Sequence, residues 1–169
     1  MSLRPLVLVA LVALIAGGCG GMYSRAMTID QRTSQGPRAE DFWDTRMRFA
    51  NGRAPTFEEK QHFHDGLSTR IGRYLREHED AANDPLTLQS FRFLHQVTTG
   101  MDAGQVEVLL GPPVSKTTDA AQMQNFARRH WPDLRERADE AWSYPFGWTV
   151  YLEKSKVVDL TQYVPVTSK

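Results

Sequence analysis

The sequence predicts an α+β fold in which helices pack on one face of a small antiparallel sheet of three to four strands. Two observations lead to this prediction. Between residues 37 and 111, apolar side chains recur at helical spacing behind recognisable capping residues. After residue 140, apolar and polar side chains alternate between turn signals, which is the pattern of half-buried strands. The 169 residues leave room for one domain of ordinary size.

The first 18 residues have the pattern of a secretion signal. Arg4 supplies one positive charge, and residues 6–16 form an unbroken apolar run that is too short for a bilayer span of roughly 20 residues. The small residues Ala16, Gly17 and Gly18 before Cys19 resemble the lipobox of bacterial lipoprotein precursors. This resemblance implies cleavage before Cys19 and acylation of its thiol. The alternative is an ordinary secretory signal in which Cys19 is incidental.

The single cysteine and the following glycine bear on the compartment. Cys19 has no intramolecular partner for a disulfide, and a free thiol is a liability in an oxidising compartment. Acylation removes that thiol and supplies a membrane anchor. In lipoproteins of this kind an aspartate after the cysteine favours the inner membrane. Gly20 at that position therefore implies the outer membrane, with the folded part facing the periplasm.

The charge balance argues against a nucleic-acid surface. Once Arg4 is removed with the signal, 19 basic residues face 20 acidic residues, so the net charge is near −1. A nucleic-acid-binding protein requires a basic excess clustered on one face.

A tether and a helical extension are predicted to precede the main domain. Residues 19–36 are polar and without periodicity, and a flexible chain of about 17 residues reaches roughly 20 to 25 Å. The extension covers residues 37–83. Its first helix opens at Pro37 and ends at Asn51-Gly52, and its second begins with a capping box formed by Thr56 and Glu59 and runs to about Ala82.

The main domain is predicted over residues 84–163, followed by a tail at 164–169. One helix opens at Asp84-Pro85 and stops before Gly100. A shorter helix is capped by Asp102 and Gln105 and ends at Gly111. Further elements follow: strands at 141–144, 148–153 and 157–160, turns at 145–147 and 154–156, and an amphipathic helical insertion at about 119–139 that Pro132 interrupts. No Asn-Gly or Asp-Gly fixes the type of the second turn.

Residues 97–113 carry a family resemblance. Gly100-Met101-Asp102, Gln105-Val106, Leu109-Leu110-Gly111 and Pro113 are similar to the signature of the SmpA/OmlA (BamE-like) outer-membrane lipoproteins. That family has threonine or serine where this chain has Asp102, a change that preserves a helix cap. Residues 142–144 and 148–160 are similar to its terminal strands. The resemblance covers about residues 86–160 and implies an α-α-β-β-β core, to which this chain adds N-terminal helices and the insertion.

No catalytic, cofactor-binding or metal-binding residue is predicted. The serines lack a Gly-x-Ser-x-Gly elbow, and there is no phosphate-binding glycine loop. His62 and His64 lie two apart in a helix and point to nearly opposite sides, so Glu58 with His62 is the better spaced pair. Two ligands do not make a metal site. His95 is expected to lie beside the core, either packed or partly exposed.

The aromatic cluster formed by Trp142, Tyr144, Phe146 and Trp148 has two interpretations. Its rings either fill the space between sheet and helices, or Phe146 and Tyr144 stand exposed at a sheet end and anchor a partner. The last strand, near residues 157–163, is a candidate open edge for another chain's strand.

The function expected from these features is a non-enzymatic, lipid-anchored scaffold or adaptor of the outer membrane that binds other envelope proteins. The family resemblance implies a role in outer-membrane protein assembly or envelope integrity, with the assembly machinery as partner. Two alternatives stay open: a periplasmic binding or inhibitor module for a soluble protein, and an exported hydrolase or metal-dependent enzyme. Neither nucleic acid nor a small-molecule substrate is expected as a partner.

Overall fold

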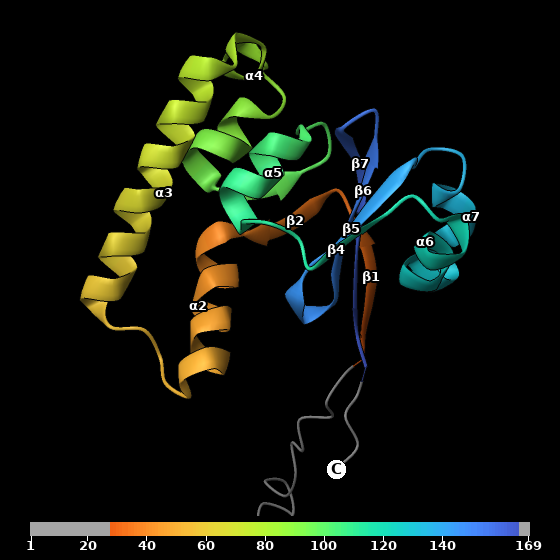
Figure 1. Cartoon of the computed structure of the whole chain (residues 1–169), viewed down its shortest axis with the longest axis horizontal. Coiled ribbons are helices and arrows are strands. Elements are labelled where there is room, and N and C mark those ends of the chain that lie inside the picture. The colour runs from red at the N-terminus through yellow and green to blue at the C-terminus, as the bar shows by residue number, and fades with distance from the viewer. Residues whose placement is uncertain (1–27, 166–169) are drawn as a thin grey trace, which may run out of the picture. The chain divides into compact units, whose positions relative to one another are not determined.

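The computed structural model describes residues 28–165 and confirms the α+β class (Figure 1). The predicted signal peptide (1–18) and Cys19 lie outside the described residues. Within 28–165, five strands form one antiparallel sheet in the order β1-β7-β6-β5-β4. Their bounds are β1 Ile29–Thr33, β4 Ser115–Thr117, β5 Glu140–Ser143, β6 Trp148–Glu153 and β7 Lys156–Val164. A second, two-stranded sheet pairs β2 (Gln35–Arg38) with β3 (Gln96–Thr98).

Six α-helices accompany these sheets in the described part of the chain. They are α2 Ala39–Asn51, α3 Phe57–Glu77, α4 Glu79–Asn83, α5 Ala103–Leu110, α6 Ala120–Ala127 and α7 Trp131–Leu134. Three short non-α helices join them: the π-helix η1 Ser90–Leu94 and the 3₁₀ helices η2 Arg128–His130 and η3 Pro145–Gly147.

The first strand corrects the predicted tether, which was expected to extend through residue 36. Residues 29–33 instead pair antiparallel with β7, from Ile29 opposite Val164 to Thr33 opposite Leu160. Arg32 reinforces this ladder, because its Nη2 lies 2.7 Å from a carboxylate oxygen of the buried Asp159. The open edge expected near 157–163 is therefore also wrong, since β7 lies between β1 and β6.

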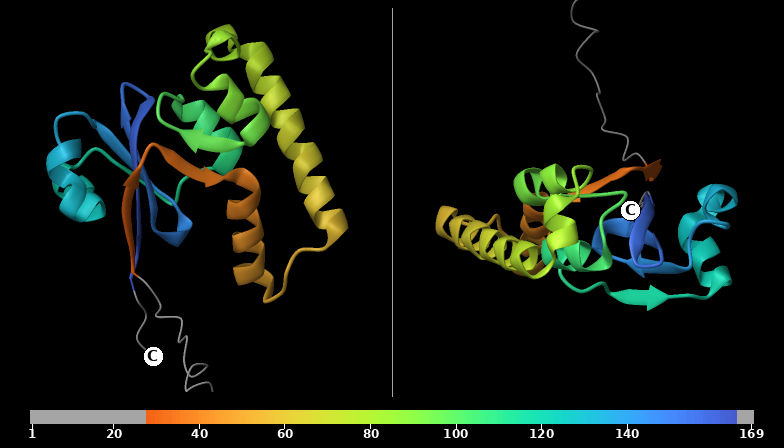
Figure 2. Two further views of the ribbon diagram at one scale, coloured as in Figure 1. Left: turned by 180° about the vertical axis from the view of Figure 1, so that it is seen from behind. Right: turned by 90° about the horizontal axis from the view of Figure 1, so that it is seen from above.

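Helices cover both faces of the five-stranded sheet, whereas one covered face was expected (Figures 1 and 2). On one face α2, α3 and α5 form the main core with alternate sheet residues, among them Trp142, Val150, Leu152 and Leu160. On the other face a second core contains Met123, Ala127, Trp131, Leu134, Ala141 and Tyr151. The predicted helical insertion at 119–139 forms α6 and α7 and supplies four of these six residues.

The predicted caps of α3 and α5 are present. The Glu59 amide donates to Thr56 Oγ1 at 3.3 Å, and the Thr56 amide donates to a Glu59 carboxylate oxygen at 2.7 Å. The Arg53 guanidinium and the Thr56 amide lower the pKa of Glu59 to about 2. α3 ends at Glu77, so the predicted helix to Ala82 is divided, with α4 as a separate short helix.

Residues 84–99 depart from the predicted single helix. The Asp84 carboxylate accepts hydrogen bonds from the Leu86 amide and the Thr87 hydroxyl, both at 2.9 Å, which closes a turn. Only η1 follows, and it ends where His95 adopts a left-handed backbone with φ 50°. The chain then leaves the helical path because β3 pairs with β2.

Asp102 joins α5 to α3 and to β7. Its Oδ1 accepts the Gln105 amide at 2.8 Å, as expected for an N-cap, and also the Tyr74 hydroxyl at 2.5 Å. Just before it, the Gly100 amide donates to the Val157 carbonyl at 2.7 Å, and the Val157 amide donates to the Met101 carbonyl at 2.7 Å. The inner face of α5 is formed by Val106, Leu109 and Leu110, which are buried.

The β6–β7 hairpin closes through a two-residue turn. Lys154 and Ser155 both have positive φ, 48° and 65°, and the flanking Glu153 and Lys156 pair. Two positive φ values in such a turn are the type I′ pattern, which normally selects Asn-Gly because other residues are strained there.

We expect Asp102→Ala to destabilise the fold by about 2 kcal/mol, because it removes the α5 cap and leaves the Tyr74 hydroxyl without its acceptor. Tyr74→Phe, which keeps the cap, should cost about 1 kcal/mol. Urea unfolding followed by circular dichroism measures both. Equal losses in the two variants would argue against the double role of Asp102.

The double variant Lys154→Asn/Ser155→Gly should raise the free energy of unfolding by about 1 kcal/mol, because Asn-Gly accepts the left-handed turn with less strain. Both substitutions keep the backbone amide and carbonyl groups of positions 154 and 155, so the backbone hydrogen bonds of the turn can still form. Ser155→Ala is the matched control and should bring no gain, since alanine keeps the strain. Thermal unfolding distinguishes the variants, and a double variant no more stable than the control would contradict the assignment of the turn.

Candidate functional site

An apolar groove of about 480 Å³, called the aromatic groove below, lies at the end of the sheet where β1 begins and β7 ends. Residues from β1, β2, α2, β3, η3, β6 and β7 line it. Its apolar walls come from Ile29, Pro37, Phe42, Phe146, Trp148 and Val164. Polar side chains, among them Arg38, Asp41, Gln96 and Gln162, complete the lining. An apolar centre with polar neighbours is the usual composition of a protein-binding surface.

Phe146 occupies this groove, as the partner-anchor interpretation requires, and it has an unusual backbone. Its φ of 62° and ψ of 27° lie in the left-handed region, which is a genuine outlier for a bulky side chain. Its half-buried ring packs on Phe42 at 5.7 Å and on Phe49 at 5.4 Å between centroids. Phe49 is itself 79% exposed. Strained residues of this kind persist where surrounding structure holds them, and they cluster at functional sites.

Tyr144, the second predicted anchor, belongs to the core instead. It is 5% exposed, and its hydroxyl donates to the Gly111 carbonyl at 3.1 Å. Burial raises the pKa of this phenol. Of the two interpretations of the aromatic cluster, the core interpretation is therefore confirmed for Tyr144, and the exposed anchor is wrong for this residue. Trp142 is also buried, with Lys116 Nζ 3.7 Å from the centre of its ring.

The turn that presents Phe146 is fixed by close backbone contact. Gly147 has φ 75°, and a Cβ at this position would lie 1.8 Å from the Tyr163 carbonyl oxygen. The Gln162 side-chain amide donates to the Phe146 carbonyl at 3.2 Å. Only glycine fits at position 147, so the sequence Pro-Phe-Gly determines where the Phe146 ring lies.

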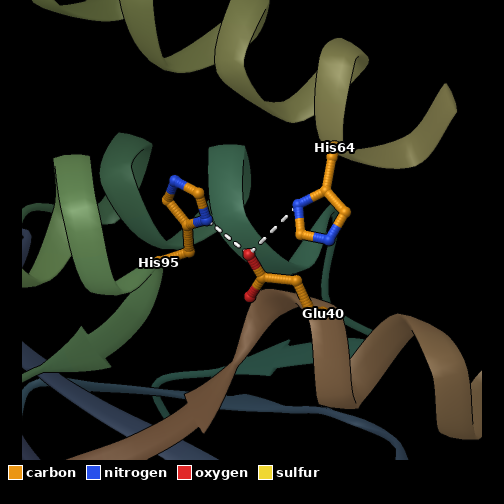
Figure 3. A group of neighbouring side chains, drawn as sticks. All are labelled: Glu40, His64 and His95. Carbon is orange, nitrogen blue, oxygen red and sulfur yellow. Dashed lines mark hydrogen bonds and ion pairs between the residues drawn. The ribbon is translucent and has the colours of Figure 1, made fainter. Parts of the chain in front are cut away.

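A second cluster combines Glu40, His64 and His95 (Figure 3). Glu40 lies in the first turn of α2, His64 on α3, and His95 between η1 and β3. Both imidazoles turn Nδ1 toward Oε1 of Glu40: His95 is hydrogen-bonded to it, and His64 lies 3.6 Å away. The Glu40 and His95 side chains are 19% and 16% exposed, whereas that of His64 is 51% exposed.

Backbone and aromatic contacts bring these three residues together. The Ala39 amide donates to the His95 carbonyl at 2.8 Å, which places Glu40 beside His95. Trp43 on α2 stacks on Phe63 of α3 with ring centroids 4.6 Å apart, which places His64 on the other side of the carboxylate.

One carboxylate oxygen of Glu40 lacks a hydrogen-bond donor within residues 28–165. Its Oε2 is buried and has no hydrogen-bond partner among the described residues. Lys60 and Arg48 line the same pocket as Glu40 but pair with Asp44, Lys60 at 3.2 Å. A buried carboxylate oxygen without a donor is uncommon and calls for a physical explanation.

The cluster in the structure differs from the pair of possible metal ligands that the sequence offered. His64, and not His62, joins other possible ligands, while Glu58 and His62 are exposed side chains outside this cluster. The prediction of no metal ligands rested on the absence of a third ligand near His62 and His64 in the sequence. The three side chains come from three elements, and no local spacing signals that they meet. Cys19, the predicted lipidation site, lies outside the described residues.

Among the helices of residues 28–165, none combines the length and the apolar character required to cross a bilayer. The described part of the chain is thus an α+β domain with a covered antiparallel sheet, an aromatic groove at one sheet end and a carboxylate–histidine cluster. Comparison of the chain with protein-family models, with curated proteins and with solved structures finds no match. The resemblance to the SmpA/OmlA family stays a prediction.

Proposed function

We propose that this protein is a non-enzymatic lipoprotein adaptor of the outer membrane, facing the periplasm, that binds another envelope protein through the aromatic groove. The observation that carries the proposal is Phe146, a ring held in a strained backbone between Phe42 and the exposed Phe49. Aromatic side chains in preformed clefts are frequent hot spots of protein interfaces.

The position of the groove relative to the predicted anchor supports this function. Ile29 lines the groove and begins β1, and it follows the predicted acylated Cys19 by ten residues. Ten residues span at most about 35 Å even when fully extended. Acylation of Cys19 would therefore keep the groove near the lipid surface, where it meets the membrane-proximal parts of envelope proteins.

The chemistry of the groove indicates what it binds. Aliphatic and aromatic walls suit a segment with one or two large apolar side chains. The resemblance of residues 86–160 to the SmpA/OmlA family favours the outer-membrane protein assembly machinery as the source of that segment.

The partner is tested by crosslinking in intact cells through a photoreactive residue at Ile29, which is 38% exposed in the groove. We expect a crosslink to an integral component of barrel assembly. Phe49→Ala and Phe146→Asn should each reduce it about tenfold, because they remove hot-spot rings. Asparagine tolerates the left-handed backbone at position 146, which offsets part of the lost packing.

Phe57→Ala is the matched control, since Phe57 is 75% exposed but, unlike Phe49, does not pack its ring on Phe146. It should leave the crosslink unchanged. Equal effects of Phe49→Ala and Phe57→Ala would contradict a role for the groove. A crosslink to a soluble periplasmic protein would instead favour a binding or inhibitor module, and crosslinks to lipid alone would exclude a protein partner.

Cys19→Ser should release the protein from the membrane fraction, because the variant has no thiol to acylate and the lipid anchor is lost. Detergent phase partitioning of the two forms from the native host measures this. Retention of the serine variant in the detergent phase would contradict the anchor while leaving the groove proposal open to the crosslinking test.

A further inference from the structure

We propose that Glu40, His64 and His95 form a binding site for a divalent transition metal, with Zn²⁺ as the metal that fits best. One ligand atom from each residue lies within 4.8 Å of the other two. The inference is independent of the groove and of the membrane anchor.

The donor set selects the class of ion. Two imidazole nitrogens and one carboxylate oxygen are typical ligands of Zn²⁺, which takes three protein ligands and leaves a fourth position for water in open sites. Ca²⁺ and Mg²⁺ prefer sites made only of oxygen ligands. A site with two histidines and one glutamate therefore favours zinc over these more abundant cations.

The observed separations are close to what coordination requires. Tetrahedral bonds of roughly 2.0 to 2.2 Å place two ligand atoms about 3.4 Å apart. His64 Nδ1 already lies 3.6 Å from Oε1 of Glu40. His95 Nδ1 is in hydrogen-bond contact with the same oxygen, so an ion entering between them would open that contact and replace its proton.

Two further features point to an occupant. Oε2 of Glu40 is buried without a partner in the described residues, and a metal coordinated by both oxygens of this carboxylate would satisfy it. His95 is held with φ 50°, a left-handed backbone that directs its ring toward Glu40. His64 is half exposed and gives the ion a path from solvent.

Binding would join three segments that meet at this point of the fold. Glu40 belongs to the first turn of α2, His64 to α3 and His95 to the junction of η1 with β3. A metal bridging them would raise the unfolding temperature, because the site exists only in the folded chain.

The test is titration of ZnCl₂ into the full chain, purified in detergent without a polyhistidine tag, in competition with a chromophoric chelator. We expect one Zn²⁺ per chain and a higher unfolding temperature. His64→Ala should weaken binding about 100-fold or more, because it removes a direct ligand from a helix face where alanine is well tolerated. Glu40→Gln should weaken it as well, since the amide lacks the charge.

His62→Ala is the matched control, because His62 lies on the same helix two positions away and outside the cluster. It should bind as tightly as the parent. The titration is repeated with Cys19→Ser so that a thiol contributes no binding. Co²⁺ should give the visible spectrum of a four-coordinate site in the parent and lose it in His64→Ala. No saturable Zn²⁺ binding, or equal affinities of His62→Ala and His64→Ala, would overturn the proposal.

Discussion

The backbone pairing of β7 on both of its edges is the constraint on which the other features depend. One edge pairs with β6 and the other with β1, which joins residues more than 120 positions apart in the sequence. The start of the same strand holds the segment before α5 through the amide and carbonyl of Val157. A shift of one residue in this register would move every side chain of β7 to the opposite face. Leu160 would then leave the main core, and Asp159 would leave Arg32 for apolar surroundings.

The same strand also forms the groove at its far end. Val164 pairs with Ile29, and Tyr163 presents the carbonyl that only a glycine at position 147 can face. Main-chain contacts, and rings that already pack on each other, therefore fix the form of the aromatic groove. A preformed surface of this kind loses little conformational entropy when it binds, so more of the contact energy appears as affinity.

Local sequence patterns predicted the elements that local interactions form, and missed those that depend on distant partners. The capped helices at Thr56 and Asp102 and the 148–160 hairpin were predictable, because their signals lie within a few residues. β1 was missed because Ile29–Thr33 is mostly polar, and its pairing with β7 decides its structure. The sequence left both a core and an exposed position open for Tyr144, since alternation does not tell which ring reaches an internal acceptor such as the Gly111 carbonyl. The Glu40–His64–His95 cluster combines three elements, and only the tertiary fold brings them together.

Helix α2 connects the two candidate sites, because its helical period gives each of them one face. Phe42 packs its ring on Phe146 in the groove, whereas Glu40 and Trp43 face α3 and the histidines. No side chain caps the start of this helix, and the Ala39 amide is held by the His95 carbonyl. The position of the first turn therefore determines both the geometry around Glu40 and the placement of Phe42. If the position of α2 couples the two sites, thermodynamic linkage requires the coupling to be reciprocal: a ligand at Glu40 changes the binding free energy of a groove occupant by the same amount as that occupant changes the binding free energy of the ligand.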